Sequence, residues 1–182
     1  MKLAIFPLGN PGDKYKKTRH NAARIVINSM LESLSLEQIK EKLNQRDRDI
    51  EYIDIVVPDT FMNESGLFIY KYMKHKSFIK DKVTGIIPIV MYDDKDLLLG
   101  QVKLSFGNSA GGHNGVQSTI NHIGKDFYRI RIGIGDESIM PIHGSGVVQD
   151  FVMSNFKDSE LKVLKSQTLH DAVMQCLLKI TN

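Results

Sequence analysis

The chain has a single cysteine, Cys176, so it cannot form an intramolecular disulfide bond, which fits a reducing compartment. Cys176 lies in an apolar helical pattern without a second cysteine for a zinc cluster, which indicates a packing role. No apolar run approaches the ~18 residues of a membrane-spanning helix. Residues 3–8 are too short for the apolar region of a signal peptide. We therefore expect a cytoplasmic protein with no membrane partner.

Several catalytic signatures are also missing. No serine lies in a G-x-S-x-G turn, and the six histidines show no H-E-x-x-H spacing. The stretch 107–112 has the spacing of a phosphate-binding loop, but His113 and Asn114 replace the required Lys and Ser/Thr. Gly133 and Gly135 do not complete a dinucleotide fingerprint. We expect no metal and no cofactor, and we interpret His113 as a loop residue.

Composition is that of an ordinary globular domain, with 42% hydrophobic and 25% charged residues among 182. We expect residues 1–182 to form one domain. The net charge of +3 is too small to establish nucleic-acid binding. Its distribution is more informative, because a basic loop precedes His20 and suggests a polyanionic substrate. The cations of this loop are Lys14, Lys16, Lys17 and Arg19.

Apolar runs and helical periodicity alternate along the chain. Pro7 predicts a strand end or an irregularity there, and Pro58 interrupts the second strand. This order predicts an α/β fold, a single-domain three-layer α/β/α sandwich with a mixed, mostly parallel sheet. Residues 36–49 carry mixed charge and predict a helical turn or a solvated loop. We expect strands at 2–8, 50–57, 86–91, 101–106 and 127–134, and helices at 20–34, from a cap at Asn63 or Ser65, at 114–123 and at 158–180.

Polar residues follow the apolar, strand-like runs, or the short turns after them, in four places. These residues are Asn10, Asn63, Asp93 and Asn114. In sheets of this class ligands bind beyond the carboxyl ends of the strands, so we expect the four to converge. An asparagine amide offers one acceptor and two donor hydrogens without charge, which suits a substrate with amide groups. Each asparagine alone would more often form a turn or a cap.

His20 is the strongest candidate for a catalytic group, because a histidine can accept a proton near neutral pH. A carboxylate on its other ring nitrogen would fix the tautomer and stabilise the imidazolium. We expect Asp93, at the end of its strand, to be that carboxylate. Asp94 is the alternative, since neighbouring strand residues point in different directions. Helix capping by His20 and a surface turn at Asp93 would explain the same residues without catalysis.

Five segments together resemble the bacterial peptidyl-tRNA hydrolase family. They are L-G-N-P-G…Y…T-R-H-N, F-M-N-E-S-G, D-D-K-D-L…G, A-G-G-H-N-G and R-I-R-I-G-I-G, in family order. The resemblance implies hydrolysis of the ester between a peptide and the 3′ end of tRNA, by a monomer with no obligate protein partner. It implies that His20 activates water, that Asp93 orients His20, and that Asn10 distinguishes blocked peptidyl groups from free aminoacyl groups. The substrate would contact Tyr15, Phe61, Asn63, Asn114, Lys103 and Arg131.

The sequence departs from the family pattern at four positions near these motifs. Pro7 replaces a glycine, Tyr92 a histidine, and Ala110 a histidine or serine. Ser105 stands where a phosphate-contacting lysine is frequent, so the tRNA contact is expected to be weaker or shifted.

Two other functions fit parts of the pattern. A non-catalytic RNA-binding protein could share the fold, although retention of His20, Asp93, Asn10 and Asn114 favours catalysis. A nuclease or nucleotide hydrolase is less favoured, because the adjacent Asp93 and Asp94 do not make a metal-binding carboxylate cluster.

Overall fold

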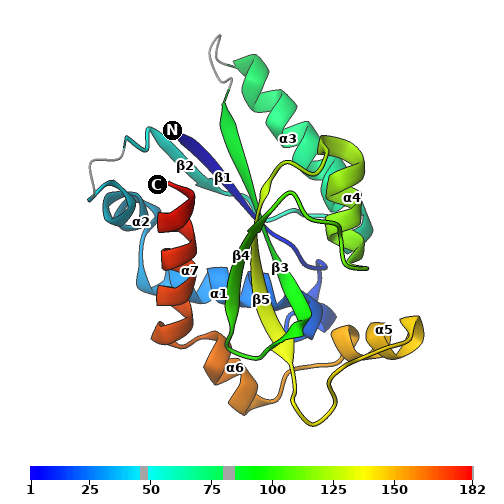
Figure 1. Ribbon diagram of the computed structural model, residues 1–182. Helices are drawn as coiled ribbons and strands as arrows, with labels where there is room; N and C mark the ends of the chain where they lie inside the picture. Colours follow the sequence, from blue (N-terminus) through cyan, green and yellow to red (C-terminus); the bar gives the residue numbers. More distant parts are fainter. Residues whose placement is uncertain (46–48, 80–84, 182) are drawn as a thin grey trace.

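The computed structural model describes residues 1–45, 49–79 and 85–181. Within these residues five strands form one mixed sheet in the order β2-β1-β3-β5-β4 (Figure 1). β4 runs antiparallel to β5, and the other neighbouring strands are parallel. The strands are β1 (Lys2–Pro7), β2 (Tyr52–Ile55), β3 (Ile86–Leu98), β4 (Val102–Phe106) and β5 (Tyr128–Gly135).

Helices cover both faces of the sheet, which confirms the predicted sandwich (Figure 1). One face carries α1 (Ala22–Ser33), α2 (Leu36–Asn44), α6 (Asp158–Leu164) and α7 (Gln167–Ile180), and the other carries α3 (Ser65–Ile79) and α4 (Asn114–Ile123). Alternate strand residues supply the two cores. Ile89 and Met91 pack with α1 and α7. Val90 and Tyr92 pack on the opposite face in the second core.

The third strand is longer than the sequence indicates. The prediction that Asp93 and Asp94 follow its end is wrong, because β3 continues to Leu98. Both residues remain in the ladder with β5, where Asp93 pairs with Ile132 and Asp94 with Gly133. On its other side β3 loses its neighbour earlier, since β1 ends at Pro7, one residue before the end of the predicted strand 2–8.

Two helical predictions need correction. Residues 36–44 form a regular helix, α2, because Ser35 forms a capping box with Gln38 and the helix buries Ile39 and Leu43. The helix predicted over 158–180 is two helices, α6 and α7, and the Ser166 hydroxyl caps the second by accepting from Leu169 N.

The cap expected at Asn63 or Ser65 is not formed. A 3-10 turn, Met62–Glu64, leads directly into α3, and the Ser65 hydroxyl is buried without a hydrogen-bond partner in the described structure. A further helix, α5 (Ser145–Met153), was not predicted. No helix in the described ranges has the length and apolar character to cross a membrane.

Candidate active site

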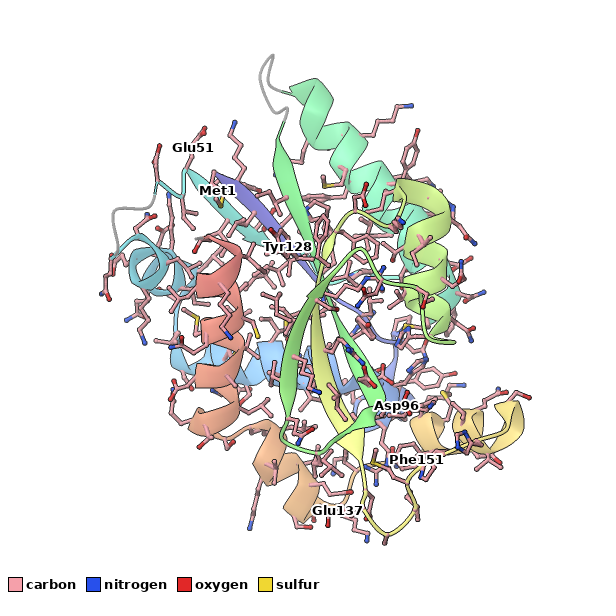
Figure 2. The ribbon with its side chains drawn as sticks, viewed as in Figure 1. Met1, Glu51, Asp96, Tyr128, Glu137 and Phe151 are labelled. Atoms are coloured by element: carbon pink, nitrogen blue, oxygen red, sulfur yellow. The ribbon has the colours of Figure 1, made fainter. Side chains whose placement is uncertain are left out.

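The polar residues gather at the carboxyl ends of the parallel strands. Figure 2 shows Met1 and Glu51, which precede β1 and β2, at one end of the molecule, and Asp96 of β3 with Glu137 toward the other. At this second end β1 stops and the chain turns away after Leu8, whose N–H donates to the Met91 carbonyl at 2.9 Å. A short turn, Arg19–Asn21, brings His20 to the β3 edge that β1 has left open.

His20 and Asp93 form a buried hydrogen-bonded pair. His20 Nδ1 lies 2.9 and 3.0 Å from the two carboxylate oxygens of Asp93. Burial lowers the pKa of His20, but the charge and hydrogen bond of Asp93 outweigh it and raise that pKa above the usual value. Burial raises the pKa of Asp93, yet the facing imidazoles hold it well below its ordinary range. Asp93 is therefore ionised and accepts from His20 Nδ1–H, so His20 Nε2 is left with a lone pair.

His113 contacts the same carboxylate, and the interpretation of His113 as a loop residue alone was incomplete. Its Nε2 lies 2.9 Å from Asp93 Oδ1. Its Nδ1 accepts from Val116 N at 3.2 Å and caps α4. Since Nδ1 is an acceptor, the proton sits on Nε2 and is donated to Asp93. The only sequence signal for this role was the place of His113 immediately before Asn114.

Asp94 does not contact His20. Its carboxylate accepts from Arg131 Nε at 2.5 Å, on the opposite side of the strand from Asp93. The structure thus brings Asp93, and not Asp94, to the candidate base. The ion pair with Asp94 also engages Arg131, which is one of the two cations that the resemblance associates with tRNA.

Asn10 is held by a network of amides. Its N–H donates to Asn21 Oδ1 at 2.8 Å, and its carbonyl accepts from Asn21 Nδ2 at 2.9 Å. Its side-chain Oδ1 accepts from Met62 N at 2.9 Å. Its side-chain NH₂ donates one hydrogen to Met153 Sδ at a long 4.0 Å, which leaves the second hydrogen as a possible donor to a substrate.

A cavity of about 1020 Å³ joins most of the predicted residues. Six of them line it, namely Asn10, His20, Asn63, Asp93, Asn114 and Arg131. The sequence did not indicate the wall that α5 contributes, which includes Val148 and Met153.

Three predicted residues are not part of the cavity lining. The rings of Tyr15 and Phe61 meet edge to face, with their centroids 6.3 Å apart. Phe61 is exposed and directly precedes Met62, a residue of the cavity. Lys103 is exposed on β4 and pairs in the ladder with Arg131 of the cavity.

Among the described residues, one group of side chains could ligate a metal ion: His20, Asp93 and His113, whose ligand atoms all lie within 4.8 Å of one another. Both imidazoles direct a ring N–H at the carboxylate. An ion bound there would have to displace both protons. The arrangement is already complete as a carboxylate that orients a base, which is the geometry of water activation.

Comparison with known proteins points to one family of hydrolases. A family model described as peptidyl-tRNA hydrolase matches residues 4–182. The chain is 39% identical over 166 residues to a peptidyl-tRNA hydrolase of Fervidobacterium nodosum, covering 89% of this chain and 81% of the relative. It is 42% identical over 170 residues to that of Oceanobacillus iheyensis, covering 88% and 82%. The crystal structure of the Acinetobacter baumannii peptidyl-tRNA hydrolase has the same fold, with a TM-score of 0.70 at 24% identity over 98% of this chain and 90% of that one.

Proposed function

Because the chain belongs to the peptidyl-tRNA hydrolase family and hydrolyses peptidyl-tRNA, we propose that His20 activates the attacking water and that Asp93 orients His20. The observation that carries this assignment is the buried 2.9 Å contact between His20 Nδ1 and Asp93 Oδ1 at the wall of the cavity. That contact leaves Nε2 as the proton acceptor. The raised pKa of His20 makes the imidazole a stronger base than an isolated one.

In the proposed reaction, Nε2 of His20 takes a proton from water while the water oxygen attacks the ester carbonyl carbon. The imidazolium that forms lies against the ionised Asp93, which offsets its charge. The bond between the carbonyl carbon and the 3′ oxygen of tRNA then breaks, and the leaving oxygen takes the proton back from His20. Water is the only co-reactant, and His20 ends in its starting state.

Asn114 is proposed to stabilise the oxyanion of the tetrahedral intermediate. It is exposed at the first residue of α4 and lines the cavity. Its amide can donate hydrogen bonds, and the partial positive charge at the start of α4 favours an anion there. Asn63 lines the same cavity and is proposed to bind the peptide backbone with its amide.

Asn10 is proposed to select the blocked substrate through its side-chain donor. Met62 N–H engages the Asn10 oxygen and Met153 Sδ accepts one hydrogen of the NH₂ group at 4.0 Å, so the second hydrogen would face the substrate. A donor there favours the carbonyl of a peptide bond and disfavours the ammonium group of a free aminoacyl ester. Burying that ammonium without an acceptor would be costly, which gives the selection a physical cause.

Contacts with the tRNA are proposed for Tyr15, Phe61, Lys103 and Arg131. The exposed ring of Phe61, paired with Tyr15, offers a surface on which a base can stack. Arg131 is held by Asp94, whereas Lys103 is exposed beside it with no carboxylate partner in the described ranges. Lys103 is therefore the better placed of the two for a phosphate.

The test is hydrolysis of N-acetyl-aminoacyl-tRNA beside unblocked aminoacyl-tRNA, by the unmodified protein and by His20→Ala. We expect cleavage of the blocked substrate alone and a loss of turnover of about 10²–10⁴-fold in the variant, with tRNA binding retained. Binding without cleavage by the unmodified protein would favour the RNA-binding alternative. Equal losses of binding and turnover in His20→Ala would contradict a role as base.

The organisation of the protein is also part of the proposal. We expect residues 1–182 to act as one domain, since the single sheet takes strands from Lys2 to Gly135 and α7 packs on it. We further expect a monomer that works in the cytoplasm. Size-exclusion chromatography with light-scattering detection should give a mass near 20.6 kDa, and twice that mass would contradict a monomer.

A further inference from the structure

Helix α5 forms one wall of the substrate cavity without a buried anchor of its own. None of its residues is fully buried. Even so, Ser145, Val148, Gln149, Val152 and Met153 all line the cavity. Only Phe151 and Val152, both half-buried, pack on the main core. The position of this wall must therefore depend on how the ends of α5 are attached.

The carboxyl end of α5 is joined to the segment that precedes His20. Arg19 N donates to the Ser154 carbonyl at 3.0 Å, and Phe156 N donates to the Lys17 carbonyl at 2.9 Å. Thr18 and Asn155 form an isolated antiparallel bridge between these two hydrogen bonds. The backbone that carries the candidate base and the backbone that ends the cavity wall are thus directly paired.

The side chain of Arg19 reinforces this junction. Its Nη2 donates to both carboxylate oxygens of Glu160, at 2.8 and 3.1 Å, and its Nε donates to Ser154 Oγ at 3.3 Å. The guanidinium lies 4.8 Å from the ring centroids of both Phe151 and Phe156. Only 8% of the side chain is exposed. A planar cation is therefore held by the last turn of α5, the following segment and the first turn of α6.

We propose that Arg19 is a positioning residue that fixes the α5 wall of the substrate cavity relative to His20. This inference rests on the proposed function of the cavity. Asp93 already orients His20, so loss of the Arg19 contacts acts on the wall and on substrate binding, and leaves the proton transfer intact. The wall also reaches Asn10, because Met153 is the neighbour of the Asn10 amide.

Arg19→Gln removes the charge and the planar fork, and Glu160→Gln removes the paired charge from the other side while it keeps one acceptor oxygen. Arg19→Lys keeps the charge but lacks the planar guanidinium group. It should therefore retain part of the function that Arg19→Gln loses. Lys162→Gln is the matched control, because Lys162 is exposed on the same helix as Glu160. The measurements are kcat and KM with N-acetyl-aminoacyl-tRNA, the pH dependence of kcat, and amide hydrogen exchange of residues 145–153 without substrate.

We expect Arg19→Gln and Glu160→Gln to raise KM about tenfold and to change kcat less than about threefold. The acid limb of kcat, which is its rise with pH on the low-pH side of the profile, should stay in place. Amide exchange in 145–153 should become faster in both variants and stay unchanged in the control. A lower kcat at unchanged KM, or a shifted acid limb, would overturn the proposal by showing that Arg19 acts on His20. Unchanged exchange would also overturn it. The exchange measurement needs no turnover, so it separates failure of this inference from failure of the proposed function.

Discussion

Asp93→Asn is the sharpest perturbation of the proposed chemistry. The substitution keeps the size of the side chain and removes the charge that faces His20 and His113. Both imidazoles donate a ring N–H to the carboxylate, from His20 at 2.9 and 3.0 Å and from His113 at 2.9 Å. An amide oxygen at the Oδ1 position could still accept from both rings, but the NH₂ group at the Oδ2 position would face the His20 Nδ1–H at 3.0 Å. His20 must therefore shift away from the amide or change its tautomer.

The size of the effect follows from these contacts. A hydrogen bond to a charged group contributes about 1.5–3 kcal/mol, which corresponds to roughly 10- to 150-fold in rate at about 1.4 kcal/mol per factor of ten. If His20 changes tautomer, its Nε2 carries a proton and cannot take one from water. Such a loss of the general base costs about 10²–10⁴-fold. We expect kcat of Asp93→Asn to fall by a factor in that second range, because the new NH₂ group faces His20 and favours the tautomer in which Nδ1 accepts, whereas His113 keeps its tautomer through Val116 N.

The pH dependence of activity gives an independent test of Asp93→Asn, because the direction in which it shifts can be predicted. His20 must be neutral to accept a proton, so activity rises with pH through the pKa of His20. Asp93 raises that pKa against the effect of burial. Without the charge, burial alone remains and lowers the pKa, so the acid limb of kcat/KM should move to lower pH in Asp93→Asn. The assay is release of the blocked amino acid from N-acetyl-aminoacyl-tRNA between about pH 5 and 9, the range around the ordinary pKa of histidine.

Asp94→Asn is the matched control on the neighbouring residue. It removes the ion pair with Arg131 and leaves His20 untouched. We expect kcat and the acid limb to stay close to those of the unmodified protein, while KM changes. An Asp94→Asn variant as slow as Asp93→Asn would refute the assignment. So would an Asp93→Asn variant whose acid limb stays in place or moves to higher pH.

Three further outcomes are expected. Lys103→Ala should weaken tRNA binding and reduce its salt dependence by about one phosphate contact, and an unchanged salt slope by filter binding would place the tRNA backbone elsewhere. Gly66→Ala should destabilise the fold by at least about 1–3 kcal/mol in urea unfolding, because the new methyl group would lie 2.0 Å from the Ser118 carbonyl oxygen, and an unchanged midpoint would contradict this close packing. The buried His170 has a pKa lowered by burial, so stability should be present above its unfolded-state pKa and be lost as pH falls, and His170→Asn should reduce that dependence in thermal unfolding between about pH 5 and 7.

The convergence of the site could be predicted because it depends on sheet geometry. Asn10 and Asp93 each follow apolar segments of parallel strands, which bring such residues to one end. Asn114 follows the antiparallel β4, which ends at the other end of the sheet, so it reaches the site only because the loop after β4 returns across the sheet. The helices were harder to predict where a single polar group decides them. Ser35 and Ser166 each cap a helix whose start the charge and apolar patterns do not mark.

The second imidazole on Asp93 could not be found from spacing. His113 lies 20 positions along the chain from Asp93, and their contact depends on how the loop 107–113 returns across the sheet. The N-cap role of His113 adds to the difficulty, because histidine is not a typical cap residue. Helix α5 was missed for a related reason: its segment has no fully buried face that would impose helical periodicity on its apolar residues.

Unequal strand lengths explain why Asp93 is accessible to both imidazoles. Pro7, the last residue of β1, pairs with Met91, so Asp93 lies two residues beyond the point where β1 leaves β3. On the other side, β5 still pairs with Asp93 and holds its backbone in the extended form. Asp93 shares its side of the strand with Met91 and lies beside the position that β1 has vacated. The turn that carries His20 and the start of α4 both reach this gap. The sequence indicates a strand end or an irregularity at Pro7, but only the register between β1 and β3 reveals that the strand ends two residues short of the carboxylate.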